Sequence, residues 1–330
     1  MSILPCLLTL LTPLFPGGDP QPGEILLGQQ PYRFRWDPAF GRTQDGADLG
    51  STHGCVQVDA QGRIYVNSDT ERAVMVFAKD GKLLRSFGAE FANGLHGMTL
   101  VREGEQEFLY LAHIGRHEVA KLTLEGEVLW RLGWPEESGK YEQEGEYRPT
   151  SVAVLPDGGL FVADGYGKSW VHQYDSKRKY LRSIGGPGNA PGQFQTPHGM
   201  AIDRRGGKSR LLVCDRENHR LEYFDLDGNY LGLVEGMLRR PCNVSFHGDT
   251  LAVADLAGRV TLLDEQNQLI CHLGDNPDPA LRASNQILRD LWKDGEFTAP
   301  HGLAFGPEGD LYVEEWNLLG RLVRLERFGK

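Results

Sequence analysis

Short stretches of alternating apolar and polar residues recur along the chain at similar intervals. Such period-two alternation, bounded by turns rich in glycine and aspartate, is typical of β-strands. Six of these stretches occupy equivalent places in the pattern, and they read RIYVNS, FLYLAH, GLFVAD, RLLVCD, TLAVAD and DLYVEE. One short apolar segment precedes each of them, and two more follow in most units. The pattern therefore predicts repeated units of four short strands.

The repeat can be measured from one anchor position at the start of each unit, which carries His-Gly in four of the six copies. The anchors are separated by 43, 54, 48, 44 and 59 positions, and they are His53, His96, Thr150, His198, Cys242 and His301. Periods of this size are typical of propellers and solenoids, and four strands form one propeller blade. The sequence therefore predicts an all-β fold, a six-bladed β-propeller.

The last unit supplies three strands, because GRLVRLERFGK ends at Lys330. An uncovered strand edge invites aggregation, and propellers avoid it by closing the ring. The apolar stretch YRFRW at 32–36 precedes the first blade and can supply the missing outer strand. We therefore expect an apolar and linker segment over 1–30 and a single propeller over 31–330, closed by an N-terminal strand.

Composition and charge narrow the partners of this propeller. The net charge of −10, from 35 basic and 45 acidic residues, argues against a nucleic-acid surface. The first residues resemble the apolar core of a signal peptide, a candidate over 1–18, but they lack basic residues and contain three prolines. Export to the periplasm or the cell exterior and retention in the cytoplasm both stay open. This run is too short for a membrane span, which needs about 20 residues, and we expect a monomer with a small-molecule or peptide substrate at the channel mouth.

Three anchor histidines fall on alternate units of the predicted ring. The first strand of a blade lines the central channel, and the loop between its second and third strands lies on the same face as the anchor. His96, His198 and His301 would therefore surround the channel with approximate threefold symmetry. Three neutral imidazoles with an open fourth position are used by catalytic zinc. The pattern predicts a site for Zn²⁺ or another divalent transition metal, although a His-Gly pair can also serve only the backbone at a strand entrance.

The other histidines have weaker patterns. His53 holds the anchor position of the first unit and is a candidate fourth ligand, a hydrogen-bond partner of a ligand, or a plain strand-entrance residue. His113 and His117 are expected in loops near the second blade. The others are expected at the surface, on outer strands or turns; they are His172, His219, His247 and His272.

The longest connection between units, 273–300, carries a different pattern. Its stretch PALRASNQILRDLWKDG spaces Leu281, Ile287, Leu288 and Leu291 as on one face of a helix. We expect a helix packed on the rim, or a lid over the metal.

Some stretches are more specific than a generic propeller repeat. PGQFQTPHGMA at 191–201 and LVCDRENHRLEYF at 212–224 resemble the NHL repeat, and no Trp-Asp pair ends the third strand as a WD40 repeat would require. Together with LFVADGYGKSWVHQY at 160–174 and APHGLAF at 299–305, they resemble the peptidyl-α-hydroxyglycine α-amidating lyases, also called peptidylamidoglycolate lyases, over about residues 53–328. The resemblance implies a six-bladed zinc propeller that cleaves a carbon–nitrogen bond and releases a peptide amide and glyoxylate.

The same resemblance implies roles for single residues. The three zinc histidines of the family match His96, His198 and His301, its catalytic tyrosine matches Tyr166, and an active-site arginine matches Arg216. A phenolate can take a proton from a metal-bound hydroxyl, and arginine can hold a carboxylate through two hydrogen bonds.

Two positions depart from the family. Asp69 stands where the lyases have another catalytic arginine, with Arg72 as a candidate substitute three residues later. Asp69 is itself a candidate additional ligand or hydrogen-bond partner of a ligand. Gly302 stands where they have the aspartate of a structural calcium site, so calcium is not predicted. The sequence therefore leaves two functions open, a zinc-dependent lyase-like enzyme and a non-catalytic NHL propeller that binds a protein or ligand on its loop face.

Overall fold

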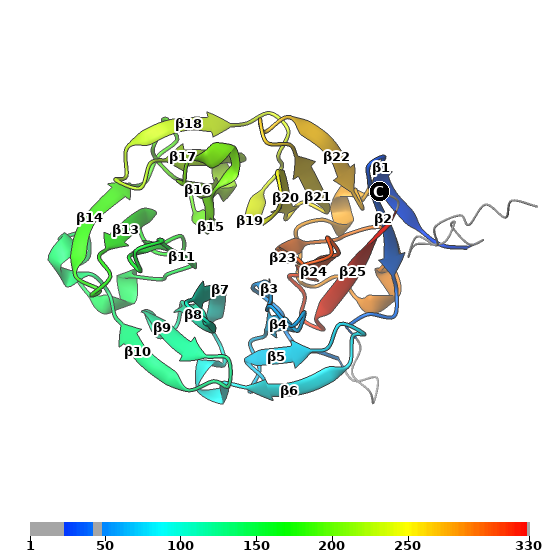
Figure 1. Cartoon of the computed structure of the whole chain (residues 1–330), viewed down its shortest axis with the longest axis horizontal. Coiled ribbons are helices and arrows are strands. Elements are labelled where there is room, and N and C mark those ends of the chain that lie inside the picture. The colour runs from blue at the N-terminus through cyan, green and yellow to red at the C-terminus, as the bar shows by residue number, and fades with distance from the viewer. Residues whose placement is uncertain (1–22, 42–47, 329–330) are drawn as a thin grey trace, which may run out of the picture.

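The chain forms a ring of six antiparallel sheets around a common axis (Figure 1). This computed structural model describes residues 23–41 and 48–328. The candidate signal peptide 1–18, including Cys6, lies outside the described residues. The six sheets confirm the predicted all-β, six-bladed propeller. Within the described ranges, no helix has both the length and the apolar character needed to cross a membrane.

Blades one to five each contain four strands in chain order, from the axis outward. Blade one has β3 (Val56–Val58), β4 (Ile64–Asn67), β5 (Val74–Phe77) and β6 (Leu83–Phe87). Blade two has β7 (Leu95–Glu103), β8 (Gln106–His113), β9 (Glu118–Thr123) and β10 (Val128–Leu132). Blade three has β11 (Ser151–Val154), β12 (Leu160–Ala163), β13 (Trp170–Tyr174) and β14 (Tyr180–Gly185). Blade four has β15 (Pro197–Asp203), β16 (Arg210–Asp215), β17 (Arg220–Phe224) and β18 (Tyr230–Val234), and blade five has β19 (Pro241–His247), β20 (Thr250–Asp255), β21 (Arg259–Leu263) and β22 (Leu269–Leu273).

Single 3-10 turns occur in the connections. They are η1 (Ala89–Phe91), η2 (Glu136–Ser138), η3 (Glu144–Glu146), η4 (Arg205–Gly207), η5 (Arg216–Asn218), η6 (Pro279–Leu281) and η7 (Arg289–Leu291).

Blade six joins the two ends of the chain. It contains β23 (Pro300–Phe305), β24 (Leu311–Glu315) and β25 (Arg321–Phe328), followed by β2 (Tyr32–Asp37) and β1 (Leu26–Gln29). Trp36 of β2 pairs with Leu325 of β25, which confirms closure by an N-terminal strand. Strand β1 lies before residue 31 and adds a fifth strand. Gln29 Nε2 donates to the Ile270 carbonyl of blade five at 2.8 Å, so β1 also links neighbouring blades.

The core lies between neighbouring blades. Strands β4, β12, β20 and β24 are buried along their whole length, because a central strand is covered by a blade on each side. Outer strands alternate instead, as in β6, whose side chains are in turn half-buried and exposed. Between blades one and two, Tyr65 and Val74 pack with Leu109 and Leu111. Burial on both faces explains why the second and third strands have the most continuously apolar sequences.

Carboxylates at the ends of the second strands hold the loops on one face. Buried loop amides need a partner, and these carboxylates accept hydrogen bonds from the segment that enters the first strand of the same blade. The contacts are Arg148 N to Asp164 at 2.7 Å, Gln195 N to Asp215 at 2.7 Å, Arg239 N to Asp255 at 2.9 Å and Ala299 N to Glu315 at 2.9 Å. The acids thereby fix the segments that contain the anchors.

The helix expected within 273–300 is wrong. The segment contains the single turns η6 and η7, and Ala283 has a φ of 53°, in the left-handed region that ends a helix. Its backbone bonds to distant partners, with Ala283 N donating to Thr298 O at 3.0 Å and Leu318 N to Asn285 O at 2.9 Å. Leu288 is 59% exposed, so the leucine spacing does not mark a buried face.

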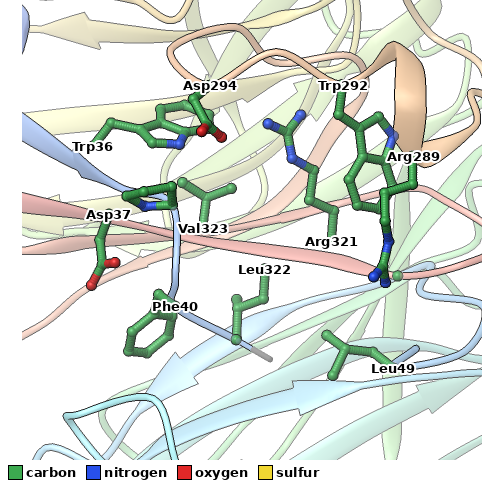
Figure 2. Close-up of a pocket in the computed structure, with 13 residues that line it drawn as sticks. Trp36, Asp37, Phe40, Leu49, Arg289, Trp292, Asp294, Arg321, Leu322 and Val323 are labelled. Carbon is green, nitrogen blue, oxygen red and sulfur yellow. The ribbon is translucent and has the colours of Figure 1, made fainter. Parts of the chain in front are cut away.

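A hollow of about 370 Å³ lies between this connection and the outer part of blade six (Figure 2). The guanidinium of Arg321 lies between two indoles of its wall, 5.3 Å from the ring of Trp36 and 5.1 Å from that of Trp292. Its described lining includes no anchor histidine, so the hollow is separate from the candidate site.

Candidate metal centre

Each predicted histidine ligand lies at a break in strand pairing. In β7 the pairing register shifts between Leu95 and Gly97, at His96. In β15 it shifts between Pro197 and Met200, at His198. In β23 it shifts between Pro300 and Gly302, at His301. Such bulges bend a strand and redirect a side chain, and they are common beside functional sites. These strands are the innermost of alternate blades (Figure 1), and the three histidine rings meet near the axis.

Hydrogen bonds between blades orient the three rings. The Nδ1 atoms of His96, His198 and His301 lie 2.9, 2.9 and 3.1 Å from the carbonyl oxygens of Thr150, Cys242 and Gly54. A carbonyl can only accept, so each Nδ1 carries the hydrogen and each Nε2 keeps its lone pair. Each acceptor belongs to the next blade. The orientation of each imidazole is therefore fixed by the packing of neighbouring blades.

The glycine after each of these histidines makes that bond possible. A Cβ on Gly97, Gly199 or Gly302 would lie 2.5, 2.4 or 2.2 Å from the same carbonyls of Thr150, Cys242 and Gly54. Carbon and oxygen atoms cannot approach so closely. These three His-Gly pairs thus have a common cause, since the glycine lets the neighbouring carbonyl reach the imidazole.

The three imidazoles form a nearly equilateral group. Ring centroids are 4.6 Å apart for His96 and His198, 4.7 Å for His198 and His301, and 5.1 Å for His96 and His301. All three side chains are buried, and Nε2 of His301 has no hydrogen-bond partner among the described residues. An orphaned, buried imidazole nitrogen is costly unless a ligand or ion satisfies it.

Electrostatics keeps these rings neutral. Burial lowers the pKa of His96, His198 and His301 well below the usual value, and the nearby Arg216 cation lowers each further. A neutral imidazole is the form that binds metals.

Tyr166 and Arg216 lie against the same group. The Tyr166 hydroxyl is 3.3 Å from Nε2 of His96 and 3.2 Å from Nε2 of His198, and it accepts a hydrogen bond from Arg216 Nη1 at 3.0 Å. Backbone hydrogen bonds hold these two residues in place, with Tyr166 N donating to Arg148 O at 3.3 Å and Arg216 N to Thr196 O at 3.2 Å. Burial raises the pKa of Tyr166, and the Arg216 cation opposes that rise. The structure brings together all five residues predicted as ligands or catalytic groups.

His53 joins the group by a different construction. Its Nε2 lies 3.4 Å from the Tyr166 hydroxyl, its ring is 4.9 Å from those of His96 and His301, and it stacks on Trp316 at 5.5 Å. A Cβ on Gly54 would meet the Asn67 side chain rather than a carbonyl of the next blade. Burial lowers the pKa of His53 to about 4. His53 is therefore an additional imidazole outside the threefold set.

Asp69 and Arg72 have partners of their own. Ser51 Oγ donates to Asp69 Oδ2 at 3.1 Å, and burial raises the pKa of Asp69. Arg72 Nη2 donates to the carbonyl of Asp48 at 3.2 Å, which directs its guanidinium toward the segment before blade one. The described hydrogen bonds join neither side chain to Tyr166 or to a histidine.

Sequence reasoning missed Cys242. Two sets of three potential donor atoms lie within 4.8 Å of one another; they are His53, His96 and His301, and His198, Cys242 and His301. Cys242 is fully buried and lies at a bulge in β19, between Pro241 and Asn243. Its alignment with the anchor histidines was the signal that could have identified it.

The surface position expected for His172 is wrong. The side chain is fully buried, with Nε2 2.6 Å from the Tyr141 hydroxyl and Nδ1 2.9 Å from Ser183 Oγ. Tyr141 in turn donates to Asp164 at 2.7 Å, so His172 belongs to the network beneath the Tyr166 loop. Tyr141 lies in the connection before blade three, and the strand pattern alone could not reveal its contact.

The donor set fits a divalent transition metal. Nitrogen and sulfur donors are typical ligands of zinc, whereas calcium and magnesium prefer oxygen. The unsatisfied His301 Nε2, the neutral rings and their fixed orientation all agree with such a metal.

Curated relatives include lyases at modest identity. The chain is 26% identical over 251 residues to a probable peptidyl-alpha-hydroxyglycine alpha-amidating lyase of Caenorhabditis elegans, covering 74% of this chain and 67% of that protein. It is 26% identical over 259 residues to the peptidylglycine alpha-amidating monooxygenase of Rattus norvegicus, of which it spans 25%. It is 29% identical over 217 residues to NHL repeat-containing protein 3 of Mus musculus, covering 61% of each. No protein-family model matches the chain.

Solved structures share the fold. A streptogramin B lyase has a TM-score of 0.59 at 13% identity, covering 84% of this chain and 94% of that one. A virginiamycin B lyase from Staphylococcus aureus has a TM-score of 0.54 at 12% identity, covering 91% and 92%. At such identities the likeness concerns the propeller alone. The chain is a six-bladed β-propeller with homologues named as amidating lyases and as an NHL repeat-containing protein.

Proposed function

We propose that this propeller is a metal-dependent, lyase-like enzyme, resembling peptidyl-α-hydroxyglycine α-amidating lyase, that cleaves a carbon–nitrogen bond and releases glyoxylate. In this proposal His96, His198 and His301 bind Zn²⁺ or another divalent transition metal. The observation that carries the proposal is the convergence of these oriented, neutral imidazoles on the group formed by Tyr166 and Arg216. The names of the relatives support the lyase class.

A small-molecule or peptide substrate would enter at the channel mouth. A bound metal ion supplies a Lewis acid that makes the hydroxyl of the substrate more acidic. Tyr166 would take that proton as a phenolate; burial raises the pKa of its hydroxyl, and the adjacent Arg216 cation opposes that rise. As the hydroxyl loses its proton, the carbonyl of glyoxylate forms, the carbon–nitrogen bond breaks, and the departing amide nitrogen takes up a proton.

Arg216 would also hold a substrate carboxylate. Its Nε now donates to Glu217 Oε1 at 2.8 Å, and Glu217 is held as well by Arg240 at 2.5 Å. Because Arg240 can keep Glu217 neutralised, Arg216 can exchange that partner for a substrate carboxylate without leaving an unpaired buried charge.

Asp69 distinguishes this chain from the lyase pattern. A carboxylate cannot bind an anionic substrate group as arginine does, and burial favours the neutral acid at this position. Asp69→Arg, assayed beside the wild type for glyoxylate release, tests this departure. A gain of activity in that variant would assign the changed substrate preference to this residue.

A non-catalytic binding propeller is the second candidate function. The similarity to NHL repeat-containing protein 3 and the loss of the family arginine at Asp69 favour it. It predicts no turnover of hydroxyglycine peptides, even with metal bound.

Glyoxylate release from a peptidyl-hydroxyglycine substrate tests the proposal. Loss of the proton acceptor in Tyr166→Phe should lower kcat/KM by about 10²- to 10⁴-fold. Tyr230→Phe, which alters a tyrosine on outer strand β18, is the matched control and should retain activity. Metal-loaded protein that releases no glyoxylate, or a Tyr166→Phe variant with full activity, would contradict the proposal.

A further inference from the structure

We propose that the Cys242 thiol is a further ligand of the same metal ion beside the three histidines, which makes the centre a mixed histidine and cysteine site and leaves the substrate hydroxyl to bind as a fifth ligand. The inference rests on the proposed metal centre and concerns which donors complete it. Cys242 comes from blade five, between the blades that supply His198 and His301.

The geometry of the donor atoms carries this inference. Those of His198, Cys242 and His301 all lie within 4.8 Å of one another, and all three residues are buried. Zinc bonds of about 2.05 Å to nitrogen and about 2.3 Å to sulfur place tetrahedral ligands roughly 3.3 to 3.6 Å apart. These three donors would therefore need to close by at most roughly 1.5 Å, whereas His96 belongs to the other donor set, with His53 and His301. The orphaned Nε2 of His301 is an independent sign that this group awaits a ligand.

The backbone at Cys242 is built like that of the histidines. The bulge between Pro241 and Asn243 corresponds to those at His198 and His301. The carbonyl of Cys242 accepts the hydrogen bond from His198 Nδ1, which couples the position of the cysteine to the orientation of that imidazole. Blade five thus presents sulfur where blades four and six present nitrogen.

The surroundings of the thiol agree with ligation on metal binding. The Cys242 side chain is fully buried and lies near the Arg216 guanidinium. Binding a divalent ion through sulfur would release the thiol proton to solvent while the electron pair forms the metal–sulfur bond. A sulfur ligand selects zinc and other thiophilic ions over magnesium, calcium and manganese.

Cobalt(II) substitution tests the inference by spectroscopy. The wild-type protein loaded with Co²⁺ should show visible d–d bands and a near-ultraviolet sulfur-to-cobalt charge-transfer band. Cys242→Ser should lose the charge-transfer band and should bind zinc at least tenfold more weakly. Loss of a hydrogen-bond partner of a ligand lowers metal affinity by roughly 10- to 100-fold, and loss of a ligand should lower it at least as much. Cys55→Ser is the matched control, because that buried thiol faces the His96 carbonyl at 3.6 Å and belongs to neither donor set.

The outcomes separate this inference from the proposed function. Visible cobalt bands without a charge-transfer band, or a band that persists in Cys242→Ser, would overturn sulfur ligation and leave the histidine centre intact. Absence of any cobalt or zinc binding would overturn both. If Cys242→Ser fails to fold, zinc X-ray absorption spectroscopy of the wild-type protein provides the test instead. A sulfur scatterer at about 2.3 Å from zinc is expected. Nitrogen and oxygen scatterers alone would refute the inference.

Discussion

Gly199→Ala tests whether the glycine after each histidine exists to admit the carbonyl of the next blade. The new Cβ would lie 2.4 Å from the oxygen of Cys242, which is also the acceptor for His198 Nδ1. Either the two blades separate locally or the imidazole loses its partner. Overpacking of this kind costs about 1–3 kcal/mol and the lost hydrogen bond about 1 kcal/mol, so we expect a loss of about 2–4 kcal/mol in the free energy of unfolding.

The same substitution should weaken metal binding, because His198 loses the contact that orients it. Loss of such a partner lowers metal affinity by roughly 10- to 100-fold. Urea unfolding of the metal-free protein and competitive zinc titration measure the two effects separately. Gly133→Ala is the matched control, since a Cβ there meets no atom within 4 Å. If Gly199→Ala matches the control in both unfolding midpoint and zinc affinity, the explanation of the His-Gly pairs is refuted.

Three further variants test other parts of the structure. Trp36 lies on the closing strand, where its indole packs 4.9 Å from the ring of Phe297. Trp36→Ala should lower the free energy of unfolding in urea by about 3–5 kcal/mol and leave zinc affinity unchanged. A variant as stable as the wild type would contradict closure by β2. Burial, with a smaller contribution from Lys140, lowers the pKa of His172 from 6.5 to about 3, so the folded state binds fewer protons than the unfolded one and stability falls as pH drops below 6.5. Between pH 7 and pH 4 the stability of wild type relative to His172→Gln should fall by roughly 3 kcal/mol, and a pH-independent difference would show that His172 is not buried in neutral form. Arg216→Lys keeps the charge but loses the planar guanidinium that can bind a carboxylate through two hydrogen bonds. KM for a carboxylate substrate in the glyoxylate assay should therefore rise at least tenfold, which corresponds to about 1.4 kcal/mol. An unchanged KM would exclude carboxylate binding by Arg216.

The fold was predictable because each blade repeats the same physical problem. Every unit must bury its second and third strands against its neighbours, which imposes a similar apolar pattern six times. The missing fourth strand of the last unit left one edge to fill, and YRFRW was the unassigned apolar stretch that could fill it. Strand β1 escaped prediction because its four residues are half-buried or exposed and lack a clear alternation.

The candidate site was predictable where the repeat itself carried the signal. His96, His198 and His301 occupy equivalent positions, so topology alone brings them together, and the family resemblance added Tyr166 and Arg216. Cys242 occupies the same position, but its residue type differs from the histidines. His172 and the segment 279–295 were misjudged because their surroundings come from long connections, through Tyr141 in one case and the partners of Ala283 in the other.

The metal content of the purified protein tests the central claim most directly. After reconstitution with zinc and removal of free metal, elemental analysis should find about one zinc ion per chain, the number that a single centre can hold. Replacement of His96, His198 and His301 by alanine should abolish that zinc, whereas replacing His219, which lies in the loop after η5, should retain it. A metal-free wild type, or a triple variant that keeps its zinc, would contradict the account.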